Sequence, residues 1–248
     1  MALPILLAED DPITREALSV HLLQLGFQVL ACSGFQAAQQ ALREQTFDYL
    51  ILDRNLPGGG ALALLRAAQA DPSAPNHATP AIVISADIEP AQRAALLALG
   101  FIAVLQKPIS ATALGAALQP PRPSLPVAPT PALSPATPTA VATLDDAMAL
   151  TACGTMEVVV GLRRLLAAEI GGFALQLQQA GADQDREKMR DTLHRLRSAL
   201  GFCGGAELLQ LIADCPSALP SETALQHILD AAERLRRQLP LPVRLPLT

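Results

Sequence analysis

The chain has 248 residues, a formal net charge of -5 and only 3% aromatic residues. Nucleic-acid binding is not expected, because phosphate contacts need clustered cations and base stacking needs aromatic rings. The longest apolar run, Ala94 to Leu105, is too short to cross a bilayer, and no basic leader precedes the first apolar segment. We therefore expect no membrane insertion and a cytoplasmic location.

The N-terminal part of the chain alternates short apolar runs with segments of helical periodicity. The apolar runs are "ILLA", "QVLAC", "DYLIL", "AIVIS" and "IAVL". Five such strand-then-helix units predict a doubly wound α/β domain over residues 1–119, with a five-stranded parallel sheet covered by helices on both faces. Ligands of such folds bind at the carboxyl ends of the strands.

Polar side chains stand where the predicted strands end. Glu9 and Asp10 follow the first strand, Asp53 ends the third, Ser85 ends the fourth and Lys107 follows the fifth. Carboxylates that converge on one sheet edge would repel one another unless a hard cation joined them, and their oxygen atoms suit Mg2+. A lysine supplies a point charge for a phosphoryl oxygen, and a serine hydroxyl can donate to another. The set predicts phosphoryl transfer.

The order of these residues resembles the receiver domain of two-component response regulators. An acidic pair, a "D-x-N-x-P-G" loop, a Ser followed by Ala, and a Lys-Pro pair each follow successive strands between Met1 and Gln119. The resemblance implies a flavodoxin-like fold in which the Asp53 carboxylate is the nucleophile that accepts the phosphoryl group. It also implies that Glu9, Asp10 and Asp53 hold Mg2+ together with the backbone carbonyl of Asn55.

The same resemblance gives roles to the remaining residues. Ser85 corresponds to the switch hydroxyl, and Lys107 to the phosphoryl-binding lysine. Three acids in a row permit a one-residue slip of the acidic pair, and we place Asp11 at the N-terminus of the helix that Pro12 begins. Val104 stands where the family usually has Tyr or Phe. The sequence therefore lacks the aromatic ring to which the switch hydroxyl is usually coupled.

An alternative compares "DRN" with phosphatases of the haloacid dehalogenase type, which also use an aspartate nucleophile at a strand end. Those enzymes generally place a second aspartate two positions on as the general acid. Asn55 stands at that position and cannot donate a proton in this way. We therefore keep the phosphatase as a minor alternative.

The composition changes after Gln119. Residues 120–142 are rich in Pro, Ala and Thr, and eight prolines lie between Pro120 and Pro138, so we predict an extended linker. After it the sequence predicts only helices, at Leu144–Leu150, Met156–Ala180, Asp183–Cys203, Ala206–Cys215 and Ser221–Leu239. This pattern predicts an all-α, up-and-down helical bundle over residues 143–240, followed by a tail at 241–248.

One histidine of the predicted bundle stands out. On the helix that ends at Cys203, the core stripe is Met189, Leu193, Leu196, Leu200 and Cys203. His194 falls away from this stripe, so we expect an exposed imidazole. Ser198 and Gly201 are small neighbours, and Arg190 and Arg197 place cations nearby. The other histidines, His21, His77 and His227, have no paired ligand spacing and are interpreted as structural or solvated.

The stretch "HRLRSALGFCG" resembles the histidine phosphotransfer (HPt) domain. His194, Leu196, Arg197 and Gly204 match the histidine, the leucine two on, the basic residue three on and the glycine ten on. Ser198 stands where glycine is commonest and keeps the patch small. The resemblance covers about Thr143 to Leu239 and implies that His194 is a second phosphoacceptor, with Arg197, Ser198 and Gly204 in support.

Together the two resemblances imply a phosphorelay component. The sequence contains no glycine-rich nucleotide-binding segment, so phosphoryl groups come from a sensor or hybrid histidine kinase, with other receiver or HPt proteins as partners. The enzymatic activity is at most phosphotransfer and self-dephosphorylation of the aspartyl phosphate. An adaptor controlled by phosphorylation, with no transfer through His194, is the alternative. The direction of flow and exchange between Asp53 and His194 within one chain stay open.

Overall fold

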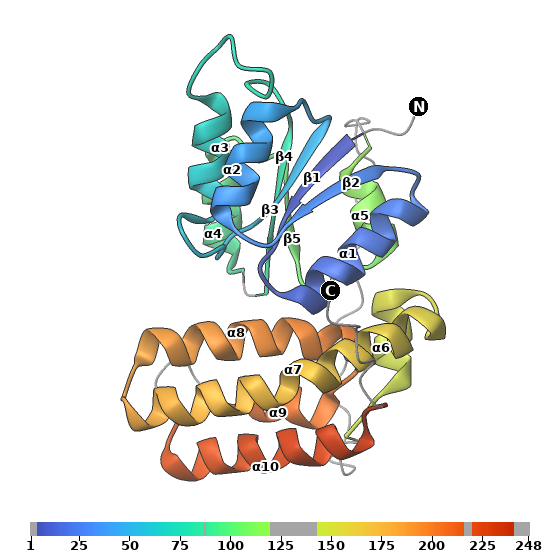
Figure 1. The fold of residues 1–248 in the computed structure, drawn as a ribbon, viewed down its shortest axis with the longest axis vertical. Helices are drawn as coiled ribbons and strands as arrows, with labels where there is room; N and C mark the ends of the chain where they lie inside the picture. The colour runs from blue at the N-terminus through green and yellow to red at the C-terminus, as the bar shows by residue number, and fades with distance from the viewer. Residues whose placement is uncertain (1–3, 87, 120–142, 216–219, 241–248) are drawn as a thin grey trace, which may run out of the picture.

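The computed structural model describes residues 4–86, 88–119, 143–215 and 220–240. Figure 1 shows an α/β domain stacked on a helical domain. The predicted linker at residues 120–142 and the predicted tail at residues 241–248 lie outside the described residues. No helix in the described ranges is both long enough and apolar enough to cross a membrane.

The N-terminal domain contains the predicted five-stranded parallel sheet. Its strands are β1 (Pro4–Ala8), β2 (Gln28–Cys32), β3 (Tyr49–Asp53), β4 (Ala81–Ser85) and β5 (Ala103–Gln106), in the order β2-β1-β3-β4-β5. All neighbouring pairs are parallel. The strands read as continuous apolar runs because both faces of the sheet are covered.

Five helices cover this sheet. They are α1 (Pro12–Gln24), α2 (Phe35–Glu44), α3 (Gly60–Gln69), α4 (Pro90–Ala98) and α5 (Ala111–Ala117). Helices α1 and α5 lie on one face, and α2, α3 and α4 lie on the other (Figure 1). Successive strand residues alternate between the two layers, so that Ile5 packs on the α1 side and Leu6 on the α2 side.

The start of α1 confirms the placement of Asp11. The Asp11 side chain accepts a hydrogen bond of 2.7 Å from the backbone N–H of Thr14, and Pro12 occupies the first helical turn. The side chain therefore caps the helix, which satisfies one of the N–H groups that a helix start leaves unpaired. Glu9 and Asp10 are left at the carboxyl end of β1.

The C-terminal region is helical, as predicted. Its helices are α6 (Asp146–Cys153), α7 (Met156–Ala182), α8 (Arg186–Cys203), α9 (Ala206–Ala213) and α10 (Glu222–Gln238). The long helices α7, α8 and α10 lie side by side in Figure 1, and α7 contacts both of the others. Side chains of Asp145, Thr155, Asp185 and Ser221 cap the N-termini of four helices.

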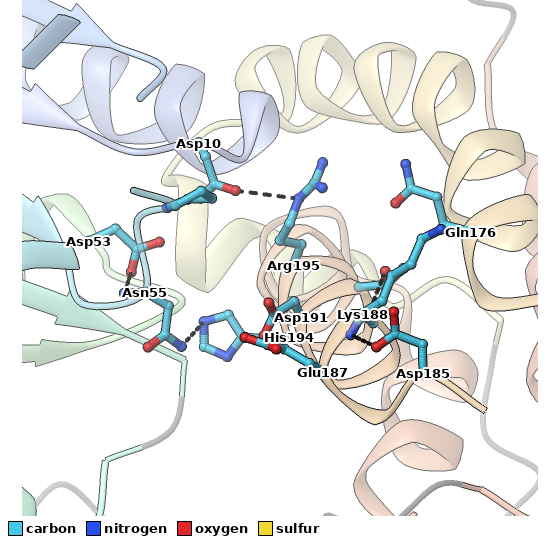
Figure 2. Close-up of a pocket in the computed structure, with 12 residues that line it drawn as sticks. Asp10, Asp53, Asn55, Gln176, Asp185, Glu187, Lys188, Asp191, His194 and Arg195 are labelled. Atoms are coloured by element: carbon cyan, nitrogen blue, oxygen red, sulfur yellow. Dashed lines mark hydrogen bonds and ion pairs between the residues drawn. The ribbon is translucent and has the colours of Figure 1, made fainter. Parts of the chain in front are cut away.

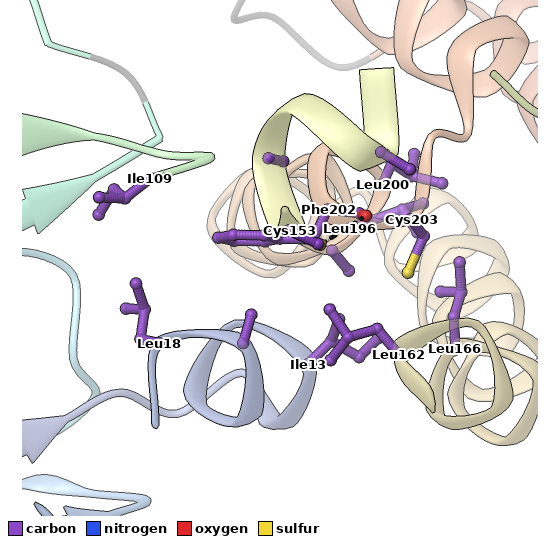
Figure 3. Close-up of a cluster of buried hydrophobic side chains, with 14 of the residues drawn as sticks. Ile13, Leu18, Ile109, Cys153, Leu162, Leu166, Leu196, Leu200, Phe202 and Cys203 are labelled. Carbon is purple, nitrogen blue, oxygen red and sulfur yellow. Dashed lines mark hydrogen bonds between the residues drawn. The ribbon is translucent and has the colours of Figure 1, made fainter. Parts of the chain in front are cut away.

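The two domains share one continuous hydrophobic core. Helix α1 contacts both α7 and α8, and its Ile13 faces Leu162 of α7 (Figure 3). Ile109, which precedes α5, belongs to the same cluster as Cys153 of α6 and Phe202 of α8. Burial of these apolar side chains from both domains stabilises the docked arrangement. It also brings the carboxyl edge of the sheet over α8.

His21 is part of this domain boundary. It lies on α1, is fully buried, and its ring centroid is 6.5 Å from that of Phe202 on α8. The structural interpretation of His21 is therefore confirmed, and the solvated one is wrong. The sequence could not show this burial, because Phe202 and Cys153 of the other domain are among the residues against His21.

Candidate functional site

The predicted strand-end carboxylates meet at one place. Glu9, Asp10 and Asp53 each offer an oxygen atom, and these atoms lie within 4.8 Å of one another. Glu9 and Asp53 are buried, and Asp10 is half-buried. They converge because β1 and β3 are neighbours in the sheet and end at the same edge.

Lys107 reaches into this cluster from the end of β5. Its Nζ lies 2.7 Å from Glu9 Oε2 and 3.2 Å from Asp53 Oδ2, and the side chains of all three residues are almost completely buried. Burial opposes the charge on Lys107, yet the carboxylates of Glu9 and Asp53 hold its pKa above the usual lysine value. The lysine is therefore a fixed positive charge beside Asp53.

The cluster carries more negative charge than Lys107 can offset. Burial raises the pKa of Glu9, and burial followed by the charge on Asp53 raises the pKa of Asp10. Both shifts express the cost of keeping several carboxylates close together in a poorly hydrated place. Closely spaced carboxylate oxygens with surplus negative charge form a donor set that fits a hard divalent cation such as Mg2+.

Asn55 and Ser85 lie at the same edge of the sheet as the cluster, and Val104 lies inside β5. The backbone N–H of Asn55 donates to Asp53 Oδ1 at 3.2 Å, so the loop after β3 folds back over the carboxylate. Ser85 ends β4, next to β3, and is buried. Val104 lies on β5 and is also buried, and its carbonyl accepts a hydrogen bond of 2.7 Å from Arg93.

His194 is less exposed than predicted. The imidazole is half-buried, because the N-terminal domain covers this part of α8, and its Nε2 lies 3.4 Å from Asn55 Nδ2 (Figure 2). The small residues of the predicted patch, Ser198 and Gly201, are buried. The patch provides the predicted room for another surface, and that surface is the receiver-like domain of the same chain.

A cleft of about 490 Å³ lies between the domains. Its lining includes Asp10, Asp53 and Asn55 from one domain and His194 and Arg195 from the other (Figure 2). Both predicted phosphoacceptors therefore face the same space, although they are far apart in the sequence. Their shared location follows from the docking of α1 on α7 and α8.

The arginine of α8 that reaches the carboxylates is neither of the two predicted to lie near His194. Arg197 donates from Nη2 to the carbonyl of Ile212 at 3.3 Å, and Arg190 lies on the surface beside Asp191. Instead, Arg195 Nε lies 3.6 Å from Asp10 Oδ2. Sequence reasoning missed Arg195 because nothing in the sequence shows which side of α8 faces the other domain.

Ser198 and Gly204 shape α8. The Ser198 hydroxyl donates to the carbonyl of His194 at 3.2 Å. Gly204 ends the helix with a φ of +74°, and its carbonyl accepts a hydrogen bond of 2.7 Å from the Asp145 N–H. Only glycine adopts such a backbone conformation without strain.

Comparison with known proteins identifies the N-terminal domain. Residues 5–119 match the family described as "Response regulator receiver domain". These residues are therefore a receiver domain of the two-component phosphorelay type, and the haloacid dehalogenase alternative is left without support. The match ends before the helical domain begins.

The relatives extend the similarity across both domains. The chain is 28% identical over 212 residues to the sensory/regulatory protein RpfC of Xanthomonas campestris, covering 82% of this chain and 28% of that protein. It is 30% identical over 237 residues to the virulence sensor protein BvgS of Bordetella pertussis, covering 91% of this chain and 18% of that protein. The chain thus spans less than a third of the length of these relatives.

A solved structure is similar to the N-terminal domain alone. It is the receiver domain of the sensor histidine kinase PA1611 from Pseudomonas aeruginosa PAO1, with a magnesium ion coordinated in its active site cleft. The identity is 24% and the TM-score is 0.43, covering 47% of this chain and 93% of that one.

Proposed function

We propose that the chain is a phosphorelay signalling protein with two phosphoacceptors, Asp53 in the receiver domain and His194 in a histidine phosphotransfer domain. Asp53 accepts a phosphoryl group from a phosphohistidine, and His194 accepts and passes on phosphoryl groups to or from receiver aspartates. The observation that carries the proposal is that Asp53 and His194 line the same cleft. A protein that exchanges phosphoryl groups between these residues needs such an arrangement.

In the first step a carboxylate oxygen of Asp53 attacks phosphorus. The phosphorus–nitrogen bond of the donor breaks, and its electron pair returns to the imidazole nitrogen. Lys107 keeps its positive charge beside Asp53 and offsets charge on the transferring oxygens. Glu9, Asp10, Asp53 and the backbone carbonyl of Asn55 would hold Mg2+, which supplies further positive charge to the phosphoryl oxygens. The buried Ser85 hydroxyl would donate to one of them.

In the second step His194 is the nucleophile. A neutral imidazole nitrogen attacks the phosphorus of the Asp53 acyl phosphate, the phosphorus–oxygen bond breaks, and the carboxylate is regenerated. The helical domain presents the imidazole at the cleft, and the charged groups come from the receiver domain. Asn55 Nδ2, at 3.4 Å from His194 Nε2, helps to fix the ring.

A phosphorelay also needs a donor and further acceptors. We propose a sensor or hybrid histidine kinase as donor, and other receiver or HPt proteins as exchange partners. The similarity to proteins named as sensors supports this assignment. A cytoplasmic location is part of the proposal.

The test uses the purified chain, acetyl phosphate and Mg2+. Intact mass gives the number of phosphoryl groups, and lability distinguishes a base-labile acyl phosphate from an acid-labile phosphohistidine. The variants are Asp53→Asn and His194→Gln. His227→Gln is the matched control, because His227 is an exposed histidine on α10, outside the cleft.

A phosphohistidine that is lost in both Asp53→Asn and His194→Gln, and kept in His227→Gln, is the expected result. An acyl phosphate on Asp53 with no phosphohistidine would favour the adaptor alternative. A phosphohistidine that persists in His194→Gln would overturn the assignment of that residue.

A further inference from the structure

Besides the packing of Phe202 near His21 of α1, helix α8 makes three contacts with the receiver domain that bear on the transfer site. His194 lies 3.4 Å from Asn55, and Arg195 Nε lies 3.6 Å from Asp10 Oδ2. About two turns further along α8, Gly201 lies against Pro108. The first two contacts face the carboxylate cluster, and at the third the absence of a side chain lets the two domains approach closely.

Arg195 is held from both domains. Its guanidinium carbon lies 5.3 Å from the ring centroid of Phe173, a buried residue of α7, so the cation stacks over the face of the ring. Its other neighbour is Asp10 of the receiver domain (Figure 2). Its Nε is buried and makes no hydrogen bond within the described residues. Its ion pair with Asp10, at 3.6 Å, is therefore longer than a hydrogen bond.

His194 and Arg195 are neighbours in the sequence, and this bears on how α8 is held against the receiver domain. Successive side chains of an α-helix point about 100° apart. Rotation of α8 about its own axis is already held by its core face, where Leu196 and Leu200 are buried in the bundle. The side chains that reach the receiver domain hold the position of α8 relative to that domain. His194 and Arg195 are successive residues, and both reach the receiver domain.

We propose that Arg195 is a positioning residue of the transfer site: its guanidinium, held over Phe173, pairs with Asp10 across the domain boundary and so keeps His194 facing the cleft that Asp53 lines. The inference rests on the proposed function, because it names the residue that orients the second phosphoacceptor. Asp10 is also one of the carboxylates that fit a divalent cation. The pair with Arg195 therefore links the contact between the domains to cation binding.

That link has a measurable consequence for cation binding. A guanidinium beside Asp10 repels a divalent cation at the carboxylate cluster and competes with it for the Asp10 oxygens. Removal of the Arg195 charge should therefore tighten Mg2+ binding, whereas a residue that merely packs would leave Mg2+ binding unchanged. The lysine variant keeps the charge and loses the planar group that stacks on Phe173.

The experiment uses the full chain with Arg195→Ala, Arg195→Lys and the control Arg190→Ala. Arg190 lies on the same helix and is exposed. Single-turnover phosphorylation with acetyl phosphate gives the ratio of phosphohistidine to Asp53 acyl phosphate. Titration calorimetry of the unphosphorylated chain gives the dissociation constant for Mg2+. Amide hydrogen exchange measures how well the backbone N–H groups of α8 are protected.

In Arg195→Ala the phosphohistidine ratio should fall about tenfold or more, because small misplacements of a reacting group cost that much. The Mg2+ dissociation constant should fall about fivefold, and exchange in α8 should rise. Arg195→Lys should restore the wild-type Mg2+ affinity and only part of the transfer. Arg190→Ala should match the wild type in all three measurements.

A wild-type phosphohistidine ratio in Arg195→Ala would overturn the inference. If the wild-type chain forms no phosphohistidine at all, the proposed function fails, and the other two measurements still decide whether Arg195 links the domains. Unchanged Mg2+ affinity and unchanged exchange in α8 would then overturn the inference as well.

Discussion

Gly201 of the helical domain lies against Pro108 of the receiver domain, so that a β-carbon at residue 201 would come within 3.1 Å of the Pro108 Cγ and Cδ atoms. Glycine inside a helix costs about 1 kcal/mol relative to alanine. At this position the absence of a side chain lets the two domains approach. The contact lies on the same helix as His194, so it affects the distance between the imidazole and the receiver domain.

Gly201→Leu should therefore separate the domains without unfolding either. The larger side chain meets the Pro108 ring, and overpacking of this kind costs about 1–3 kcal/mol. We expect a larger radius of gyration by small-angle scattering and at least a tenfold loss of transfer from Asp53 to His194.

The matched control is Gly172→Leu. Gly172 is an exposed residue inside α7, and a β-carbon there meets no other atom within 4 Å. That variant should keep the compact shape and the transfer. Equal behaviour of the two variants would show that the docked arrangement does not depend on the contact at Gly201.

Much of the receiver domain could be predicted from the sequence, because its signals are local. The apolar runs mark the strands, and Pro12 after three acids marks the start of a helix, where Asp11 indeed acts as the cap. The parallel topology then brings Asp53 and Lys107 to one sheet edge. These steps need only strand direction and helix capping.

The cleft could not be predicted in the same way. The half-burial of His194 and the pairing of Arg195 with Asp10 depend on how two domains pack together. Helical periodicity shows which residues of α8 face their own core. It does not show that this core continues across the domain boundary through Phe202 and Ile13.

Lys107 should be essential for the stability of the receiver domain as well as for transfer. Its Nζ is the cation between Glu9 and Asp53, and removing one partner of a buried ion pair costs about 3–5 kcal/mol. Lys107→Ala should therefore lower the free energy of unfolding by about 3 kcal/mol, measured by urea denaturation near neutral pH. Millimolar Mg2+ should recover part of the loss, because it supplies positive charge to the same carboxylates.

The control for this variant is Lys188→Ala, which removes the other lysine of the chain, a half-exposed residue of α8. A surface substitution of this kind should change the free energy of unfolding by less than about 0.5 kcal/mol. A loss of similar size in both variants would contradict the role given to the buried ion pairs of Lys107.

His21 should make the stability of the docked chain depend on pH. Burial lowers the pKa of His21 from its ordinary value of 6.5, and the backbone groups of Cys153 and Ile109 offset part of that shift. Between the lowered pKa and 6.5 the unfolded chain binds a proton that the folded chain lacks. The stabilising contribution is therefore full above pH 6.5 and is lost as the pH falls through the lowered pKa.

We expect the free energy of unfolding to fall with decreasing pH in this window, with a slope of at most about 1.4 kcal/mol per pH unit from this one group. His21→Leu should remove that part of the slope, whereas His77→Gln should leave it, since His77 lies in a surface loop and is not buried. Urea denaturation between pH 5 and 8 gives the comparison. Identical slopes in wild type and His21→Leu would show that His21 does not cause this part of the pH dependence.

Gly204 should support His194 through the fold and not through the chemistry. Its φ of +74° is strained for any residue with a β-carbon, and a β-carbon there would collide with the carbonyl of Asp145. Gly154, at the end of α6, has a similar φ of +81°, but a β-carbon there would meet nothing within 4 Å. The ψ of Gly154 is -35° and that of Gly204 is +30°, so Gly154 offers a strained backbone of a different kind, without a collision.

Gly154→Ala should lower the free energy of unfolding by about 1–3 kcal/mol, the cost of a backbone conformation that residues with a β-carbon rarely adopt. Gly204→Ala should lower it by at least about 2 kcal/mol, because the left-handed strain adds to the collision that forces α8 and Asp145 apart. Thermal and urea unfolding of both variants measure the difference. The ratio of phosphohistidine to Asp53 acyl phosphate should stay near that of the wild type in the fraction of Gly204→Ala that remains folded. A folded Gly204→Ala chain with normal stability and no phosphohistidine would instead place Gly204 in the transfer chemistry.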